Sequence, residues 1–329
     1  MGNGASTGRL MRLFVMAILA FAGMAGFAGT ASAADGQVLK TWFADSGLPN
    51  SWIKGIFRDG GLVLVTSGDD VRGGTSSFDP ESGRFVPFAP GAGFAGRRVA
   101  GWAEFGGKSY AGTESALNVR EKGKWSSLDR FQQVQHAEEA LFADAAALYA
   151  VARVMYGGVL KFDGKAWSIV DRGPGTGIMN NATSLLTRGG EIYIGTTTNG
   201  LFRYDGKAWK VVGPSDGLPG VWVTSLAVTD EGVWVGCYNG LALFEGDKLR
   251  KFTVDDGLPS NRVSALKVVK GRLLVGTMDA GLSIRTRRGF QNVSAANGLS
   301  DPRITAIGEA DEGAWVGTVN GLNLVEVRE

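Results

Sequence analysis

A segment of about forty residues recurs along this chain, and this repeat constrains the fold more than any other feature of the sequence. The stretches DGLPGVWVTSLAV, DGLPSNRVSALKV and NGLSDPRITAIGE open three successive units, and weaker copies such as GLPNSWIKGI lie upstream. Their opening glycines, Gly217, Gly257 and Gly298, are spaced by 40 and 41 residues. A second glycine closes the second apolar run of each unit, at Gly195, Gly236, Gly276 and Gly317. A fixed period of this length indicates a repeat architecture.

Each unit is predicted to contain four short strands. In the unit that opens at Gly217, VTSLAV and GVWVG flank the turn at residues 230–232, and GLALFE and KLRKFTV flank the turn at residues 246–247. Apolar residues that alternate between Gly and Asp turns are typical of β-hairpins. Units of about 40–45 residues with four strands are typical of propeller blades.

The N-terminal residues are predicted to be an export signal. Arg9 and Arg12 precede an apolar run over residues 13–29, and the small-residue segment Ala-Ser-Ala follows at 31–33. This order matches a secretory signal peptide with a cleavage site after Ala33. The alternative is an uncleaved membrane anchor, but three glycines interrupt the run, which is shorter than the ~20 apolar residues of a spanning helix. We therefore expect a periplasmic or secreted mature chain that is not embedded in a membrane.

The length of the mature chain sets the number of blades. Without the signal peptide 296 residues remain, which corresponds to seven units of about 42 residues. The last unit ends in GLNLVEVRE and supplies three strands, and the stretch from Gly36 to Ala44 can supply its missing outer strand. The prediction is therefore one all-β domain over residues 34–329. It is a seven-bladed β-propeller of four-stranded antiparallel blades, whose ring is closed when the N-terminal strand joins the last blade.

Charge and composition exclude several function classes. Removing residues 1–33 removes two arginines and leaves 32 basic and 32 acidic residues, so we expect neither a nucleic-acid partner nor an anionic membrane surface. One cysteine, Cys237, excludes an intramolecular disulfide framework, and one histidine, His136, excludes a multi-histidine metal centre. We expect no metal and no cofactor. Cys237 is interpreted as a small buried side chain.

Two further sets of residues are interpreted as structural. The acidic pairs at Asp230–Glu231 and Asp311–Glu312 fall in hairpin turns, where acidic residues favour turn geometry. Large aromatic residues recur in the outer strands and are expected to pack between blades rather than bind sugars. These aromatic residues are Trp125, Trp167, Trp209 and Phe252.

The repeat resembles a known family. The pattern DGLPSNRVSAL…LLVGTMDAGLSI, with the variants DEGVWVG and DEGAWVGT, is similar to the two-component regulator propeller repeat. The last four units match well, whereas the first three depart from the pattern. The resemblance implies a periplasmic sensor-type propeller, like the extracytoplasmic halves of some bacterial histidine kinases. Because the chain ends at Glu329 within the last blade, we expect a stand-alone protein that would signal by contact with another protein.

One position varies between the units in a chemically informative way. It lies four residues before the aligned apolar residue of each innermost strand, so the seven copies are expected to surround the mouth of the central channel. The turn after the closing glycine should add residues to the same face. Arginine offers a fixed fork of donors for carboxylate or phosphate, and tryptophan offers a flat face for sugars or cations. The candidate ligand-binding residues are Trp52, Arg98, Asn181, Trp222, Arg262, Arg303, Tyr238 and Arg153.

Two functions remain open at this point. The first is an exported, non-enzymatic binding or sensing module that recognises a small anionic or sugar-like ligand, or an extracytoplasmic partner protein such as a membrane sensor. The second is a propeller-type lyase or hydrolase that acts on a polysaccharide or a small anionic substrate. The second would need His136 as a base at the channel mouth, and no second catalytic residue is identified beside it. The arginines could also be ordinary solvated surface residues.

Overall fold

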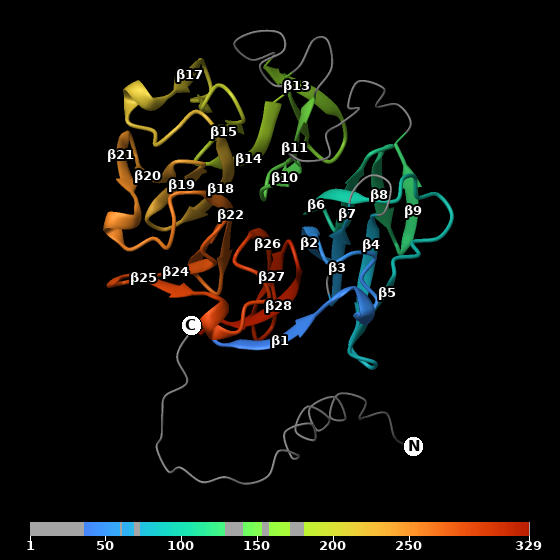
Figure 1. The fold of residues 1–329 in the computed structure, drawn as a ribbon. Helices are drawn as coiled ribbons and strands as arrows, with labels where there is room; N and C mark the ends of the chain where they lie inside the picture. The colour runs from blue at the N-terminus through green and yellow to red at the C-terminus, as the bar shows by residue number, and fades with distance from the viewer. Residues whose placement is uncertain are drawn as a thin grey trace, which may run out of the picture. The chain divides into compact units, whose positions relative to one another are not determined.

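The computed structural model describes residues 36–59, 61–68, 73–128, 141–152, 158–171 and 181–328. In this part of the chain, seven four-stranded antiparallel sheets are arranged around a ring (Figure 1), which confirms the predicted seven-bladed propeller. The proposed signal peptide at residues 1–33 lies outside the described residues, as do His136, Ala137 and Arg153.

The blades follow one another in sequence, and each begins with its innermost strand. Blade 1 contains β2 (Ile53–Asp59), β3 (Leu62–Ser67), β4 (Gly74–Asp79) and β5 (Arg84–Pro87). Blade 2 contains β6 (Val99–Phe105), β7 (Lys108–Thr113), β8 (Leu117–Glu121) and β9 (Lys124–Ser127). Blade 3 contains β10 (Leu141–Ala143), β11 (Leu148–Ala152), β12 (Gly158–Phe162) and β13 (Trp167–Asp171). Blade 4 contains β14 (Ala182–Arg188), β15 (Glu191–Thr196), β16 (Leu201–Tyr204) and β17 (Trp209–Val212).

The remaining blades match the best-conserved copies of the sequence pattern within the chain. Blade 5 contains β18 (Val223–Thr229), β19 (Gly232–Cys237), β20 (Gly240–Glu245) and β21 (Lys248–Phe252). Blade 6 contains β22 (Val263–Val269), β23 (Arg272–Thr277), β24 (Leu282–Thr286) and β25 (Gly289–Val293). Blade 7 contains β26 (Ile304–Glu309), β27 (Gly313–Thr318), β28 (Gly321–Glu326) and, as its outer strand, β1 (Val38–Trp42).

The N-terminal strand closes the ring, as predicted. β1 pairs antiparallel with β28, so that Val38 lies opposite Val325 and Trp42 lies opposite Leu322. The innermost strands β2 and β26 of the first and last blades also contact each other. Both ends of the described propeller therefore meet in blade 7, which leaves no unpaired edge between them.

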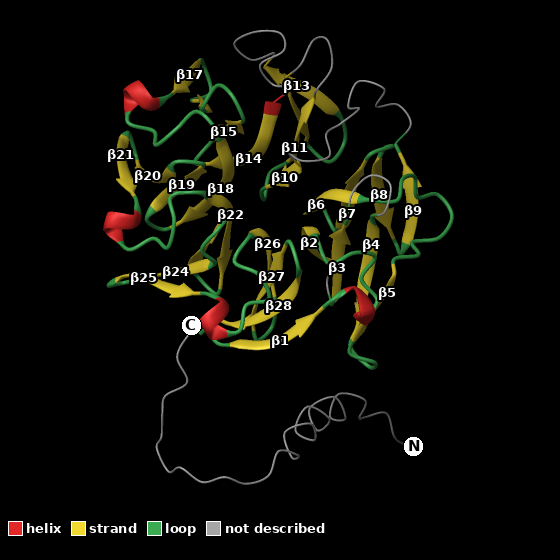
Figure 2. Ribbon diagram, in the orientation of Figure 1, coloured by secondary structure: helices red, strands yellow, loops and turns green. Residues whose placement is uncertain are grey.

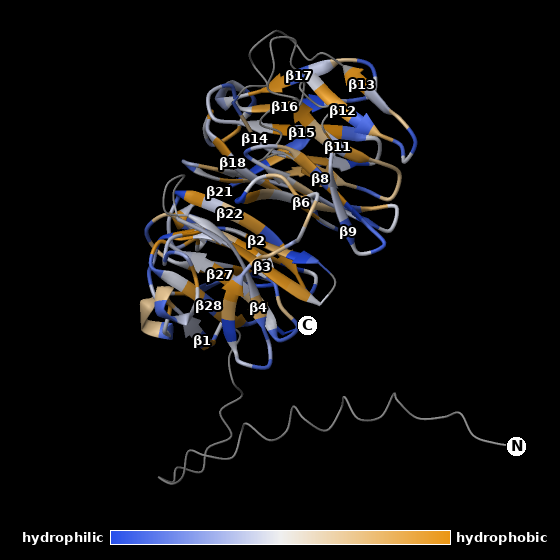
Figure 3. Cartoon of the chain, turned by 90° about the vertical axis from the view of Figure 1, so that its right-hand side faces the viewer, coloured by the Kyte–Doolittle hydropathy of each residue, from blue (hydrophilic) through white to orange (hydrophobic). Residues whose placement is uncertain are grey.

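The closing glycines of the repeat mark the places where one blade packs on the next. A Cβ atom at Gly276 would lie 2.6 Å from Cγ2 of Ile304, the first residue of the next innermost strand. At Gly236 a Cβ would lie 2.8 Å from Cγ1 of Val263, which holds the same place in blade 6. The glycine recurs because a side chain of the following blade lies directly against its backbone. Figure 3 shows the hydropathy of the chain, with apolar residues mainly in the strands and polar residues mainly at the turns.

The GLP motifs form the loops between blades. Single turns of 3-10 helix precede the motif glycines (Figure 2). Gly217 and Gly257 end two of these turns with φ of 103° and 97°, in the left-handed region that favours glycine. The described turns are η1 (Ala44–Ser46), η3 (Pro214–Asp216), η4 (Val254–Asp256) and η5 (Ala295–Asn297).

The aromatic residues of the outer strands pack mainly on rings of their own blades, as Trp167 does on Phe162 and Trp209 on Tyr204. Phe252 also packs on Phe290 of the next blade, as expected, with ring centroids 5.8 Å apart.

Trp125 is 8% exposed, and its ring centroid lies 4.9 Å from that of Phe94 and 5.7 Å from that of Trp102. In blade 5, Trp234 is fully buried with Phe252 at 5.2 Å. These rings contribute to the core and are not available as sugar platforms.

Candidate functional site

Two kinds of connection lie at the same end of the blades. In an antiparallel meander, alternate connections fall at alternate ends. The loops that enter each innermost strand and the turns between second and third strands therefore share one face of the ring. We call this face the loop face, and the face formed by the other turns is called the opposite face.

The predicted residues that the structure describes occupy equivalent places on the loop face. Except for Tyr238, which follows the second strand β19, each directly precedes an innermost strand. The first residue of that innermost strand pairs with the last residue of the second strand, as Val99 after Arg98 pairs with Thr113. The backbone carbonyls of five of them accept an N–H from the residue after that second strand, at 2.8–3.2 Å. These five are Trp52, Asn181, Trp222, Arg262 and Arg303.

Three of the predicted residues form a contact cluster across blades 5 and 6. The carbonyl of Trp222 accepts the N–H of Tyr238, which places the two side chains next to each other. Their rings stack with centroids 4.9 Å apart and planes 5° from parallel. The guanidinium carbon of Arg262 lies 5.0 Å from the centroid of the Tyr238 ring. We call Trp222, Tyr238 and Arg262 the stacked cluster.

The stacked cluster is accessible to solvent. Trp222 is 40% exposed although Tyr238 covers one face of its indole. Val221 beside it is 46% exposed. The Arg262 side chain is half-exposed and lies 3.6 Å from a carboxylate oxygen of Asp279. The cluster thus combines a partly exposed aromatic pair with one guanidinium group whose charge is partly balanced by Asp279.

The other arginines of the loop face have carboxylates as close neighbours. Asp301 accepts two hydrogen bonds from the Arg303 guanidinium, at 2.8 and 2.6 Å. These bonds lower the pKa of Asp301. The carboxylate of Glu114 accepts the backbone N–H groups of Arg97 and Arg98. The sequence prediction placed no acid in the ring of seven aligned positions, and it did not identify Asp279 and Asp301 as the partners of Arg262 and Arg303.

The remaining predicted residues make contacts within their own blades. The Lys54 ammonium lies 3.3 Å from the ring centroid of Trp52, which is 39% exposed. The Asn181 side chain donates to Oγ1 of Thr198 at 3.3 Å. The structure thus joins Trp222, Tyr238 and Arg262, and it places Trp52, Arg98, Asn181 and Arg303 on the same face in separate local contacts.

The chain has one histidine and one cysteine as possible reactive side chains. His136, which the lyase alternative requires, is not among the described residues. Within the described residues, no group of three or more His, Cys, Asp or Glu side chains could hold a metal ion. Cys237 is fully buried in β19, and burial raises the pKa of its thiol to about 12. This agrees with its interpretation as a packed side chain rather than a nucleophile.

Turn acids on the opposite face do more than shape turns. Glu231 of blade 5 lies 3.3 Å from the guanidinium of Arg285 in blade 6. Asp311 of blade 7 pairs with Arg58 of blade 1 at 2.6 Å. Sequence reasoning interpreted these acids as turn residues only, because their partners lie in the following blade.

Comparison with solved structures identifies the same architecture elsewhere. The extracellular domain of a putative hybrid two-component system from B. thetaiotaomicron is 18% identical with a TM-score of 0.64, over 89% of this chain and 40% of that one. PorZ, a surface component of the type-IX secretion system of Porphyromonas gingivalis, is 15% identical with a TM-score of 0.58, over 88% and 48%. A WD40 β-propeller domain is 11% identical with a TM-score of 0.57, over 89% and 98%.

These likenesses establish the fold. The chain spans less than half the length of the first two structures, and its identity to all three is below 20%. No protein-family model and no curated protein matches the chain. The propeller that the repeat resemblance implied is confirmed. Among the described residues, no helix has the length and apolar character needed to cross a bilayer.

Proposed function

We propose that this chain is an exported, non-enzymatic binding or sensing module that recognises its ligand or partner through the loop face. The observation that carries this proposal is the solvent-exposed stack of Trp222 on Tyr238 with Arg262 beside it. Large aromatic residues in a propeller blade normally lie in the core, as Trp234 does. An exposed parallel pair with an adjacent cation suits recognition better than packing.

The chemistry of the cluster favours a ligand with one flat apolar face and one acidic group. The exposed part of the Trp222 indole can pack on a sugar ring or a planar group. Arg262 can donate two parallel hydrogen bonds to a carboxylate that takes the place of Asp279, since that pair is 3.6 Å apart and half-exposed. An acidic sugar combines both features. An acidic loop of a partner protein with an aromatic side chain would use the same contacts.

The balance of charges narrows the ligand class. Asp301 and Asp279 lie against Arg303 and Arg262, so these two arginines do not form a broad cationic surface. Attraction of highly charged polymers would need a net local charge. Recognition by stacking with a single charged contact therefore fits this face better than general anion binding.

Export and sensing are supported by two separate observations. Residues 1–33 have the order of a secretory signal peptide. The repeat resembles that of two-component regulator propellers, and one solved structure with this fold is the extracellular domain of a putative two-component system. Fold likeness alone does not assign a function, so the proposal depends on the stacked cluster itself.

The test compares Trp222→Ala with a control that removes an equally exposed apolar side chain elsewhere. Ile169→Ala serves this purpose because Ile169 is 54% exposed on the outer strand β13. A thermal-shift screen of uronic acids, neutral oligosaccharides and organic acids against the mature chain identifies a ligand. Pull-down from a cell-envelope extract, followed by mass spectrometry, identifies a protein partner.

We expect Trp222→Ala and Arg262→Ala each to weaken binding about tenfold or more, because each removes a stacking or charge-assisted contact. Ile169→Ala should bind like the wild type. Equal affinities of Trp222→Ala and Ile169→Ala for the ligand would contradict the proposal that the loop face is the recognition surface.

A further inference from the structure

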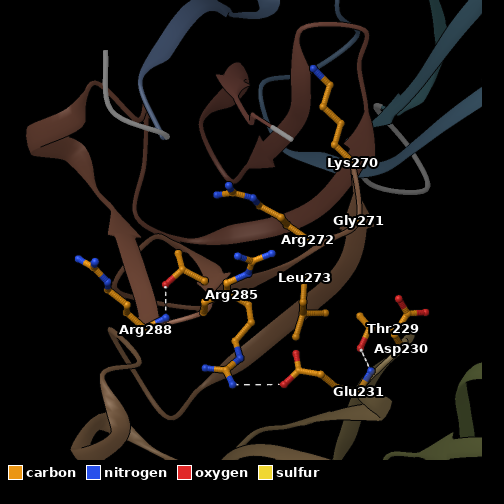
Figure 4. A pocket seen from close by; sticks show the side chains of 11 residues that line it. Thr229, Asp230, Glu231, Lys270, Gly271, Arg272, Leu273, Arg285 and Arg288 are labelled. Atoms are coloured by element: carbon orange, nitrogen blue, oxygen red, sulfur yellow. Dashed lines mark hydrogen bonds and ion pairs between the residues drawn. The ribbon is translucent and has the colours of Figure 1, made fainter. Parts of the chain in front are cut away.

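The opposite face carries a cleft between blades 5 and 6 with a volume of about 990 Å³ (Figure 4). Three hairpin turns border it: the turn between β18 and β19, the turn between β22 and β23, and the turn between β24 and β25. These turns lie at the other end of the blades from the stacked cluster. The cleft is therefore separate from the proposed recognition surface.

Basic side chains outnumber acidic ones in this cleft by five to two. The acidic side chains are Asp230 and Glu231, and Arg285 already engages Glu231 at 3.3 Å. In the part of the chain that the structure describes, the side chains of Arg287 and Arg288 have no carboxylate partner. The basic residues are Lys270, Arg272, Arg285, Arg287 and Arg288. Such an excess is notable in a chain with nearly equal numbers of basic and acidic residues.

Arg285 is held in a fixed position at the base of this group. Its guanidinium carbon lies 5.2–5.8 Å from the ring centroids of Trp234, Phe252 and Phe290, and only 18% of its side chain is exposed. Figure 4 shows the guanidinium directed to Glu231. A cation that is already ordered loses little conformational entropy when an anion binds beside it.

Lys270 has an uncommon backbone conformation. Its φ is 49°, and Gly271 after it has φ of 73°, so both central residues of this two-residue turn are left-handed. Left-handed geometry is unfavourable for an ordinary L-residue, and Asn or Gly is preferred there. Lys122 has the same conformation in blade 2, outside the cleft, so the turn geometry fixes the place of Lys270 and its charge adds to the basic group.

We infer that this cleft binds a compact polyanion with two or more phosphate or carboxylate groups. Phosphate and carboxylate groups each present oxygens that match the donor fork of arginine. A polyanion with several of these groups can bind to side chains of the turn β24–β25 and of the turn β22–β23 at the same time. The inference goes beyond the proposed function, because it concerns a second site at the other end of the blades.

Calorimetric titration of the mature chain with inorganic tripolyphosphate and with citrate tests the site. Acetate, which carries a single charge, is the control. We expect tripolyphosphate or citrate to bind, acetate not to bind measurably, and affinity to fall with added sodium chloride. The stronger of the two multivalent anions distinguishes a phosphate ligand from a carboxylate ligand. Failure of both to bind at low salt would overturn the inference.

A double variant distinguishes anion binding in the cleft from attraction by the net charge of the protein. Arg287→Ala with Arg288→Ala should weaken binding of the preferred anion by about tenfold or more. The matched control is Lys165→Ala with Lys207→Ala, which removes two exposed charges from the turns β12–β13 and β16–β17 on the same face. An equal loss in the control would show that net charge, and not this cleft, attracts the anion.

A second pair of variants separates binding from stability. Lys270→Asn removes the charge and places a residue that tolerates left-handed geometry in the turn. Lys122→Asn does the same in blade 2, where Lys122 has φ of 51°. Neither change should lower the melting temperature, and only Lys270→Asn should weaken anion binding. Unchanged affinity in Lys270→Asn would contradict the assignment of the anion to this cleft.

Discussion

The indole N–H of Trp42, in the strand that completes blade 7, donates to the carbonyl oxygen of Gly83 in blade 1 at 2.8 Å. Trp42 also packs against Trp315 of blade 7 and Phe78 of blade 1, with centroids 5.0 and 5.7 Å apart. A single side chain from the N-terminal strand therefore joins the two ends of the ring.

Trp42→Ala is expected to destabilise the propeller by about 3–5 kcal/mol, the usual cost of truncating a buried large aromatic residue. Leu39→Ala on the same strand is the control, because Leu39 is 45% exposed and should cost little. Urea unfolding followed by tryptophan fluorescence measures both. Equal stabilities of the two variants would contradict the role of Trp42 in closing the ring.

Gly276→Ala should lower stability by about 1–3 kcal/mol, because its Cβ would press on Ile304 of the next blade. Gly213→Ala is the matched control, since a Cβ there meets nothing within 4 Å and the backbone is extended. Thermal unfolding of both variants tests this explanation of the repeat. A loss of stability in Gly213→Ala but not in Gly276→Ala would contradict the explanation that Gly276 is required by its contact with Ile304.

Cys237 should not react with a thiol reagent in the folded protein at pH 8, because it is fully buried and its thiol pKa is raised to about 12. It should react at once in denaturant. Rapid labelling of the native protein would show that β19 opens in solution.

Cys237→Thr should fold with a stability within about 1 kcal/mol of the wild type. Threonines hold the equivalent place in other blades. The hydroxyls of Thr196, Thr277 and Thr318 each donate, at 2.8 Å, to the backbone carbonyl of a glycine at the start of the third strand or directly before it. A new hydroxyl at residue 237 can donate to the carbonyl of Gly240, which occupies that place in blade 5. Equilibrium unfolding in urea measures the difference.

Asp301→Asn should reduce the loss of stability in acid. The hydrogen bonds from Arg303 lower the pKa of Asp301 in the folded protein, so the folded state binds its proton less readily than the unfolded state. The stabilisation is present above the unfolded pKa of about 4 and is lost as pH falls through the lower folded value. Arg303→Ala should remove the same pH dependence, measured by urea unfolding between pH 6 and pH 2.5. A steeper pH dependence in either variant would refute this linkage.

The candidate site was predictable in position but not in its contacts. The alignment of units placed Trp222 and Arg262 at equivalent points, because each unit repeats the same register between its first and second strands. It did not predict that Tyr238 stacks on Trp222 or that Asp279 lies beside Arg262. The partner of Arg303 could have been predicted from the sequence, since Asp301 lies two residues away in the same loop.

The sequence by itself determined the ring, its seven blades and its closure by the first strand. The blades depend on a pattern that repeats about every forty residues, in which turns and alternating apolar residues act locally. The closure followed from the count of strands, because the last unit has three and one further strand precedes the first unit. Only the tertiary structure decided which charges meet, because those contacts join neighbouring blades. Glu231 and Arg285 are 54 residues apart, and Arg58 and Asp311 are 253 apart. The basic cleft arises in the same way, from turns of two blades that the ring brings together.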